Sequence, residues 1–188
     1  MPTKKLSAAE KNFRAFAKRF EKNLRNVPDF PKPGILFKDI TTVLKNKKLF
    51  GETVQQLAKR YEGKKIDKIV SVESRGFIFG AALAYELGAG FVPVRKPNKL
   101  PAEKLREEYA LEYGTDALEI HVDAIKKGEK ILIHDDVLAT GGTAAATARL
   151  VERLGGKVVG ACFLIELAFL NGREKLPNLD VLSLIKVS

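Results

Sequence analysis

The chain has no tryptophan, one cysteine, one methionine and two histidines in 188 residues. A single cysteine cannot form an internal disulfide, and Cys162 stands in the apolar run 158–165, where we expect a buried thiol in a reducing compartment. No third ligand is spaced to join the histidines, so no metal site built directly by the protein is expected, and His134 is predicted to be packed and neutral.

Long apolar runs are also missing. No stretch approaches the roughly 20 apolar residues that cross a bilayer. The first 20 residues lack the apolar region of a secretory signal, and no membrane partner is expected. Together with the single cysteine, these features predict a cytoplasmic protein.

Positive charge is unevenly distributed along the chain. The net charge is +10, yet residues 1–65 contain 17 Lys and Arg against 6 Asp and Glu, whereas residues 66–188 contain 16 against 17. Aromatic and basic residues are not interleaved as in RNA-binding modules, and zinc-finger spacing is absent. We interpret the excess as a solvated helix face and turn lysines, with a phosphate-rich ligand or an RNA surface as the alternatives, and do not expect a nucleic-acid partner.

Helix-like and strand-like segments alternate. Helices are expected over residues 7–26, 44–61, 77–87 and 144–154, and strands over residues 66–72, 90–94, 117–122, 130–133, 158–165 and 181–185. Ser7 opens the first helix with Glu10 as its capping-box partner. The polar segment 98–113 is predicted to be a long mobile loop, and residues 117–122 an exposed strand. This alternation predicts one α/β domain over residues 1–188 with a mostly parallel sheet, whose ligands bind beyond the carboxyl ends of the strands.

An apolar strand, two acids, a loop of small residues and an Ala-rich helix follow one another in ILIHDDVLATGGTAAAT, residues 131–147. Small residues let a phosphate approach the backbone, and free N–H groups at a helix start point toward it. The motif is neither a Walker A sequence nor G-x-G-x-x-G. Asp135 and Asp136 suit a ligand with hydroxyls or a cation beside its phosphate, because carboxylates accept hydrogen bonds and stabilise positive charge. The loop itself comprises Ala139, Thr140, Gly141, Gly142 and Thr143.

This element resembles the signature that binds phosphoribosyl pyrophosphate (PRPP) in type I phosphoribosyltransferases. The resemblance implies that residues 139–143 hold the 5′-phosphate and that Asp135 and Asp136 face the ribose hydroxyls. The segment VESRGFIFG, residues 72–80, is similar to the pyrophosphate loop of the same family. It implies that Ser74 and Arg75 bind pyrophosphate, beside a strained, often cis, peptide at Glu73–Ser74; the Arg fork suits two phosphate oxygens.

Residues 92–114, VPVRKPNKLPAEKLREEYALEYG, resemble the flexible catalytic loop of the adenine phosphoribosyltransferases in this family. The match implies that Lys96 and Lys99 contact pyrophosphate. It makes Glu112 the acid/base candidate near the purine and places Tyr113 beside it over the site, as a further PRPP-binding residue. A loop of this kind excludes water from a reactive sugar.

Residues 30–40, FPKPGILFKDI, resemble the adenine-side hood of the same enzymes. Prolines restrict the backbone there, and a fixed backbone edge can recognise a purine through its N–H and C=O groups. The resemblance places Leu36 and Lys38 at the base. Many members carry Arg where this chain has Lys38, and a lysine cannot stack or fork as an arginine does.

Four motifs in the family's order imply the type I phosphoribosyltransferase fold: a central, mostly parallel sheet flanked by helices, a small N-terminal helix and hood over about residues 1–40, and a flexible loop over about residues 95–115. The implied reaction is purine salvage, in which adenine and PRPP give AMP and pyrophosphate through an oxocarbenium-like transition state. The family also implies Mg²⁺ bound with PRPP or pyrophosphate, and a homodimer. Two alternatives are a transferase for a 6-oxopurine such as xanthine or hypoxanthine, and a PRPP-binding regulator of nucleic acid.

Overall fold

The structure is a computed structural model that describes residues 7–110 and 115–188. It separates into two units, residues 1–56 and 57–188. Each is described by itself below. Among the described residues, no helix is long and apolar enough to span a bilayer.

The N-terminal unit begins with helix α1 (Ala8–Asn23). The predicted capping box is confirmed, since the Ser7 hydroxyl accepts the Glu10 N–H at 3.2 Å and the Glu10 carboxylate accepts the Ser7 N–H at 2.7 Å. Phe16 and Phe20 are buried. The basic residues of the helix are exposed, as expected of a solvated face: Lys11, Arg14, Lys18, Arg19 and Lys22.

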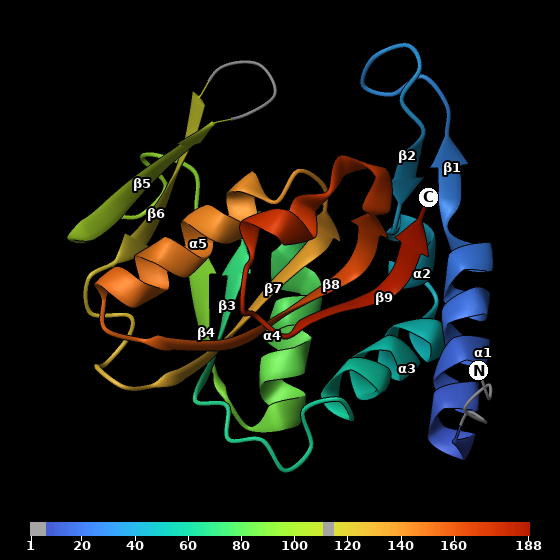
Figure 1. Ribbon diagram of the computed structural model, residues 1–188, viewed down its shortest axis with the longest axis horizontal. Coiled ribbons are helices and arrows are strands. Elements are labelled where there is room, and N and C mark those ends of the chain that lie inside the picture. Colours follow the sequence, from blue (N-terminus) through green and yellow to red (C-terminus); the bar gives the residue numbers. More distant parts are fainter. Residues whose placement is uncertain (1–6, 111–114) are drawn as a thin grey trace. The chain divides into compact units, whose positions relative to one another are not determined.

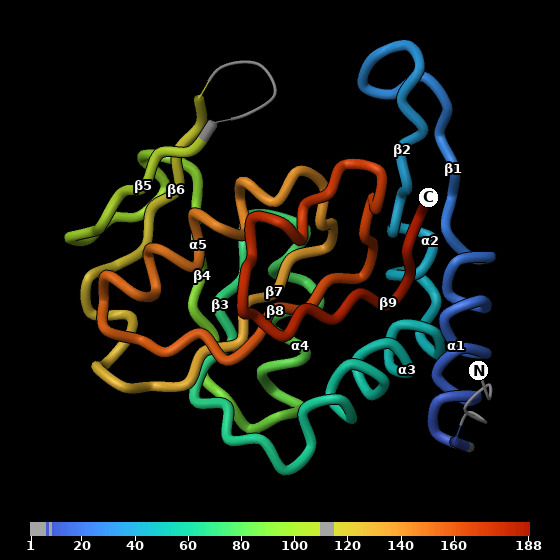
Figure 2. The backbone as a smooth tube through the Cα atoms, viewed as in Figure 1, coloured from blue at the N-terminus to red at the C-terminus, as the bar shows by residue number. Residues whose placement is uncertain are grey.

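A two-stranded hairpin follows α1 in the same unit. Strand β1 (Arg25–Val27) pairs antiparallel with β2 (Phe37–Asp39), and the connection between them, visible as the blue loop in Figure 2, contains a cis Phe30–Pro31 bond. Helices α2 (Thr41–Leu44) and α3 (Lys47–Ala58) come next.

A five-stranded parallel sheet organises the C-terminal unit, in the order β4-β3-β7-β8-β9 (Figure 1). The predicted parallel sheet is confirmed. Its strands are β3 (Lys68–Val72), β4 (Gly90–Val94), β7 (Lys130–Leu138), β8 (Lys157–Leu167) and β9 (Val181–Val187).

Helices cover both faces of this sheet, which explains the continuous apolar runs of its central strands. Helix α4 (Arg75–Leu87) packs on β3, β4 and β7, whereas α5 (Gly142–Arg153) packs on β7 and β8. Ile131, Leu132 and Ile133 in β7 are completely buried. The short 3-10 helices η1 (Ala168–Leu170) and η2 (Gly172–Lys175) join β8 to β9.

Two predictions for residues 98–122 are wrong. The supposed mobile loop contains strand β5 (Lys104–Ala110), which pairs antiparallel with β6 (Thr115–His121). Its charges hid an alternation in which Leu105 and Tyr109 pack inward, whereas Arg106 and Glu108 are exposed. Glu107 shares the inward face and pairs with Arg149 and Arg153 of α5. Strand β6 is not exposed, because Leu118 and Ile120 belong to the apolar core that α5 also contacts.

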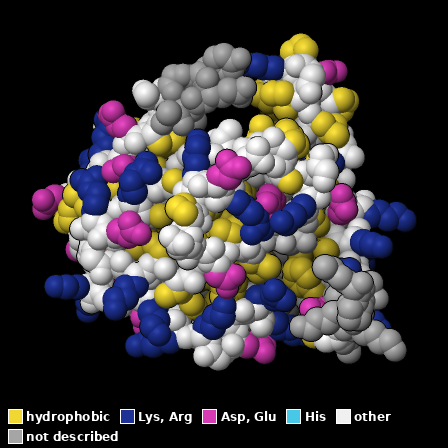
Figure 3. All heavy atoms as spheres, viewed as in Figure 1, with side chains coloured by type: hydrophobic (Ala, Val, Ile, Leu, Met, Phe, Trp, Pro, Cys, Tyr) yellow, Lys and Arg dark blue, Asp and Glu magenta, His cyan; other side chains and the backbone are white. Residues whose placement is uncertain are grey.

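Charges of both signs mix on the surface. On the face shown in Figure 3, Lys and Arg side chains are interspersed with Asp and Glu.

Candidate active site

The carboxyl ends of neighbouring parallel strands bring the predicted motifs to one edge of the sheet. Residues 73–75 follow β3, residues 95–99 follow β4, and residues 139–143 follow β7. The segment with η1 and η2 follows β8 at the same edge. Segments far apart in the chain therefore meet because their strands are adjacent.

The small-residue loop forms a hollow of about 50 Å³ after β7, lined by residues 137–144 and Asp135. Helix α5 begins at Gly142, and its N-cap Gly141 has a φ of 77°, a left-handed conformation that favours glycine. The first N–H groups of a helix have no intrahelical acceptor. The loop therefore has the geometry of an anion site.

The two predicted acids lie inside β7, not beyond its end as expected, because the strand continues to Leu138. Asp136 is 5% exposed. The Asp135 carboxylate accepts the Asp136 N–H at 2.9 Å. Burial and the neighbouring Asp136 raise the pKa of Asp135, and burial raises the pKa of Asp136 although Arg75 opposes it. Two adjacent carboxylates, Asp136 buried and Asp135 partly buried, suit a ligand that supplies hydroxyls or positive charge.

Arg75, the first residue of α4, joins the second motif to the acids. Its Nε lies 2.5 Å from Oδ2 of Asp136. The peptide between Glu73 and Ser74 is cis, as the resemblance implied. Ser74 is exposed just before the helix.

Gly76 explains how α4 can begin so close to the acids. A Cβ there would lie 2.8 Å from the Asp135 carboxylate and 3.3 Å from its Cα. A residue with a side chain at this position would have to displace the Asp135 carboxylate, and the strand or the helix would have to give slightly as well.

Glu73 holds the segment that follows β4, residues 95–99, at the same edge of the sheet. Arg95 Nε donates to its carboxylate at 3.0 Å, Arg95 Nη2 donates to it at 3.1 Å, and so does the Lys96 N–H at 3.1 Å. Hydrogen bonding by Arg95 lowers the pKa of Glu73. Lys99 is exposed, and its carbonyl accepts Arg95 Nη1 at 3.1 Å.

Lys96 is already engaged within the chain. Its ammonium pairs with Asp116 and lies 3.2 Å from the Tyr109 hydroxyl, which in turn lies 3.3 Å from the Thr143 hydroxyl of the small-residue loop. Burial lowers the pKa of Lys96, but hydrogen bonds to Asp116 and Tyr109 outweigh it and keep that pKa above its usual value. Sequence reasoning missed Asp116 and Tyr109; the alternation in β5 was the signal that could have found Tyr109.

The remaining predicted residues fall elsewhere. Glu112 and Tyr113 lie outside the described residues. Leu36 and Lys38 belong to the N-terminal unit, where Leu36 is 49% exposed and Lys38 Nζ donates to the Asn26 side chain at 2.9 Å.

His134 and Cys162 are core residues, as predicted. Both are completely buried, and Nδ1 of the histidine lies 3.3 Å from Sγ of the cysteine. Burial lowers the pKa of His134 to about 4, so the ring is neutral at pH 7. Burial also raises the pKa of Cys162 to about 12.

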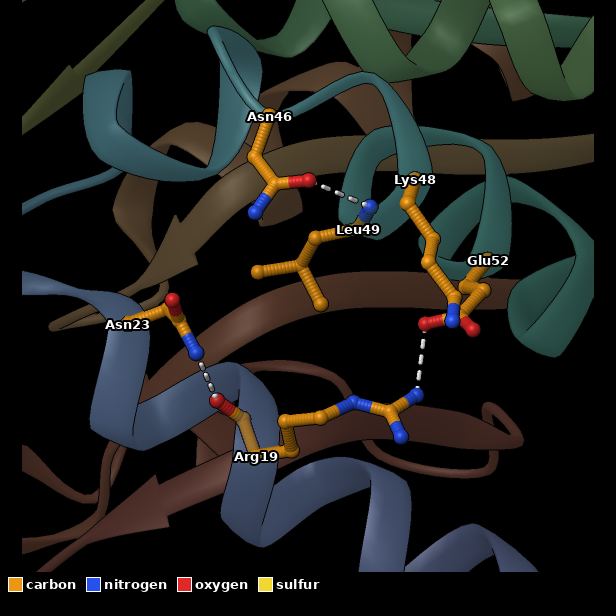
Figure 4. A pocket seen from close by; sticks show the side chains of 6 residues that line it. All are labelled: Arg19, Asn23, Asn46, Lys48, Leu49 and Glu52. Carbon is orange, nitrogen blue, oxygen red and sulfur yellow. Dashed lines mark hydrogen bonds and ion pairs between the residues drawn. The ribbon is translucent and has the colours of Figure 1, made fainter.

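A separate hollow of about 130 Å³ lies in the N-terminal unit (Figure 4). The Arg19 side chain crosses it from α1 to pair with Glu52 of α3 at 2.5 Å, and the Asn46 side chain accepts the Leu49 N–H. Its lining has neither a glycine-rich backbone nor an acid pair, so it does not match the site at the sheet edge.

Comparison with known proteins agrees with this geometry. Residues 39–185 match the phosphoribosyl transferase domain. The adenine phosphoribosyltransferase of Geobacter metallireducens is 64% identical over 162 residues, which are 86% of this chain and 95% of the relative. That of Acidobacterium capsulatum is 59% identical over 165 residues, 88% of this chain and 91% of the relative.

Solved structures give the same result. The adenine phosphoribosyltransferase of Thermoanaerobacter pseudethanolicus superposes with a TM-score of 0.89 at 58% identity, covering 91% of this chain and 99% of that one. The Saccharomyces cerevisiae enzyme, solved with an imino-altritol bisphosphate and adenine, gives 0.87 at 44% identity, covering 92% and 99%. The chain therefore belongs to the phosphoribosyl transferase family and, within it, to the adenine phosphoribosyltransferases.

Proposed function

We propose that the protein transfers the phosphoribosyl group of PRPP to N9 of adenine, giving AMP and pyrophosphate in purine salvage. The observation that carries this proposal is the meeting of an anion hollow, the adjacent acids Asp135 and Asp136, and Arg75 at one sheet edge. The relatives named above support adenine as the base.

In the proposed reaction, the bond from the anomeric carbon to pyrophosphate breaks as a bond to N9 forms. Positive charge then spreads over the ribose ring. Asp135 and Asp136 would face the ribose hydroxyls and stabilise that charge electrostatically, without acting as nucleophiles. The burial of Asp136 supports this role, because charges interact more strongly where water is excluded.

Each phosphate end would have its own partners. The loop of residues 139–143 would hold the 5′-phosphate through its backbone N–H groups. Ser74, Arg75, Lys96 and Lys99 would bind the leaving pyrophosphate and neutralise its charge. In this arrangement the guanidinium group of Arg75 would bind pyrophosphate while its Nε remains beside the Asp136 carboxylate.

Recognition of the base is assigned to residues of the hood and of the segment that contains Glu112. Glu112 would take the purine proton, with Tyr113 beside it over the site. Leu36 would contact adenine, and its exposed apolar side chain supports this role. Lys38 would contribute mainly through its backbone, since its ammonium is bound to Asn26.

Mg²⁺ would accompany PRPP or pyrophosphate and neutralise part of its charge. In residues 7–110 and 115–188, no group of three or more His, Cys, Asp or Glu side chains is placed to hold a metal ion. Mg²⁺ commonly keeps water and phosphate oxygens as ligands, so PRPP or pyrophosphate would supply its coordination without a ligand directly from the protein. A homodimer and a cytoplasmic location complete the proposal.

A base panel tests the proposal. The protein is incubated with PRPP, Mg²⁺ and adenine, hypoxanthine, guanine or xanthine, and pyrophosphate release is followed. We expect turnover with adenine, loss of turnover in Asp135→Asn, and normal turnover in the matched exposed variant Asp123→Asn. Turnover with only the 6-oxopurines would overturn the adenine assignment. Absence of any turnover, with salt-dependent binding to RNA or DNA, would overturn the enzymatic one.

A further inference from the structure

We propose that Arg173 is a positioning residue for the 5′-phosphate loop, acting through Gly172 and held by Glu166. The inference rests on the proposed function, which assigns residues 139–143 to the 5′-phosphate. It adds a side chain that follows a different strand and lies outside all four sequence motifs.

The turn at η2 touches the phosphate loop, backbone against backbone. A Cβ added to Gly172 would lie 2.1 Å from the Ala139 carbonyl oxygen, and one added to Gly141 would lie 2.2 Å from the Gly172 carbonyl oxygen. Real Cβ contacts are essentially never shorter than 3.0 Å. The position of Gly172 therefore limits where the loop backbone can lie.

Arg173, the next residue, anchors this turn to two strands. Its Nε and Nη2 donate to the two carboxylate oxygens of Glu166, at 2.6 and 2.7 Å. Nη1 donates to the Val181 carbonyl at 2.8 Å, and Nη2 also lies 3.2 Å from the Ser183 hydroxyl. One guanidinium thus joins η2 to the end of β8 and to β9.

Burial makes this ion pair a firm anchor. The Glu166 side chain is 6% exposed and that of Arg173 36%. Burial raises the pKa of Glu166, but hydrogen bonding to Arg173 outweighs it, so the carboxylate stays ionised at neutral pH. Bidentate, charge-assisted pairs of this kind define direction as well as distance, which a lysine at the same place cannot do.

The anchor therefore reaches the ligand in two steps. Arg173 holds Gly172, and Gly172 supports the backbone of residues 139–141. A displacement of about 1 Å in a group that positions substrate can cost about 100-fold in rate. We expect loss of the Arg173–Glu166 ion pair to weaken binding of the 5′-phosphate. Binding of pyrophosphate should be spared, because Arg75 and Lys96, its proposed partners, follow other strands.

Arg173→Lys and Glu166→Gln test this inference. The binding of ribose 5-phosphate and of pyrophosphate is measured by calorimetry, together with kcat and the KM for PRPP. We expect ribose 5-phosphate to bind about 10-fold more weakly, the KM for PRPP to rise, and pyrophosphate affinity to change less than about 2-fold. Arg106→Lys is the matched control, because its ion pair with Glu108 is exposed, and it should change none of these values.

Gly172→Ala gives an independent measurement, since it keeps both side chains of the ion pair and perturbs the contact with Ala139 directly. It should show the same selective loss of ribose 5-phosphate. Unchanged ribose 5-phosphate affinity in folded variants, or an equal loss for both ligands, would overturn the inference. Failure of the proposed function would differ from both, because the wild-type protein itself would form no AMP.

Discussion

The contact between Gly80 and Ser71 sets how α4 lies on the sheet, and Gly80→Ala is expected to disturb the site from a distance. The Ser71 hydroxyl lies 2.9 Å from the carbonyl oxygens of both Gly76 and His134. It thus joins the beginning of α4, where Arg75 stands, to the strand that carries the acids. Gly80 faces this hydroxyl from the next turn of α4.

The size of the effect follows from the geometry. A Cβ at position 80 would lie 2.1 Å from Oγ and 2.8 Å from Cβ of Ser71, whereas ordinary contact begins at 3.4 Å. The hydroxyl or the helix must therefore move by about 1.3 Å in a close-packed region. Overpacking costs about 1–3 kcal/mol, and loss of the buried hydrogen bond adds about 1 kcal/mol. We expect the free energy of unfolding to fall by about 2–4 kcal/mol and kcat/KM to fall by about 10-fold or more.

Urea unfolding and AMP formation measure these two quantities. Gly51→Ala is the control, because nothing lies within 4 Å of a Cβ there, and alanine should stabilise α3 by about 0.5–1 kcal/mol. In the double variant Ser71→Ala/Gly80→Ala, the shorter contact is relieved, so its cost should fall below the sum of the single costs by about 1 kcal/mol or more. Additive costs, or a Gly80→Ala protein as stable and active as wild type, would refute the reasoning.

Three further variants test other parts of the structure. Burial and the adjacent carboxylate raise the pKa of Asp135, so its ionised form lowers stability as pH rises above the ordinary value of 3.8. Asp135→Asn should therefore raise the free energy of unfolding at pH 7 by on the order of 1 kcal/mol, a gain that shrinks toward pH 3. Equal stability of the two proteins from pH 3 to pH 7 would contradict this. The same variant should abolish AMP formation. Asp116→Asn removes the carboxylate that pairs with Lys96 and should tighten pyrophosphate binding, measured by calorimetry, by up to about 5-fold. Unchanged or weaker binding would show that Asp116 does not compete with pyrophosphate for Lys96. Ser7→Ala removes the α1 cap and should cost about 1 kcal/mol in urea unfolding without changing activity; a cost below about 0.3 kcal/mol would show that the cap is dispensable.

The phosphate loop and its neighbours could be predicted because their chemistry is local. A run of consecutive residues is enough to indicate a loop that a phosphate can approach, a glycine with positive φ and the beginning of a helix. Gly141 is an example, because it is the N-cap of α5 and has a positive φ. The apolar run of β7 and the two acids that follow it could also be predicted, but the sequence did not show that the strand continues to Leu138. Resemblance to a known family then implied a cis peptide at Glu73–Ser74, which the structure contains. It also implied that Arg75 binds pyrophosphate, which stays a prediction, although the structure places this side chain beside Asp136.

Contacts between distant segments were decided only by the tertiary structure. The charges of residues 104–110 favoured a loop, but pairing with β6 and burial of Tyr109 outweigh that local preference. Nothing near Lys96 in the chain indicates that Asp116 will bind it, and nothing near Gly141 indicates that Gly172 will support it. The sequence by itself determined which residues are expected to bind phosphate and to stabilise a cationic sugar. Only the tertiary structure determined which side chains hold these residues in place, because such contacts depend on strand order and non-local packing rather than on neighbouring residues.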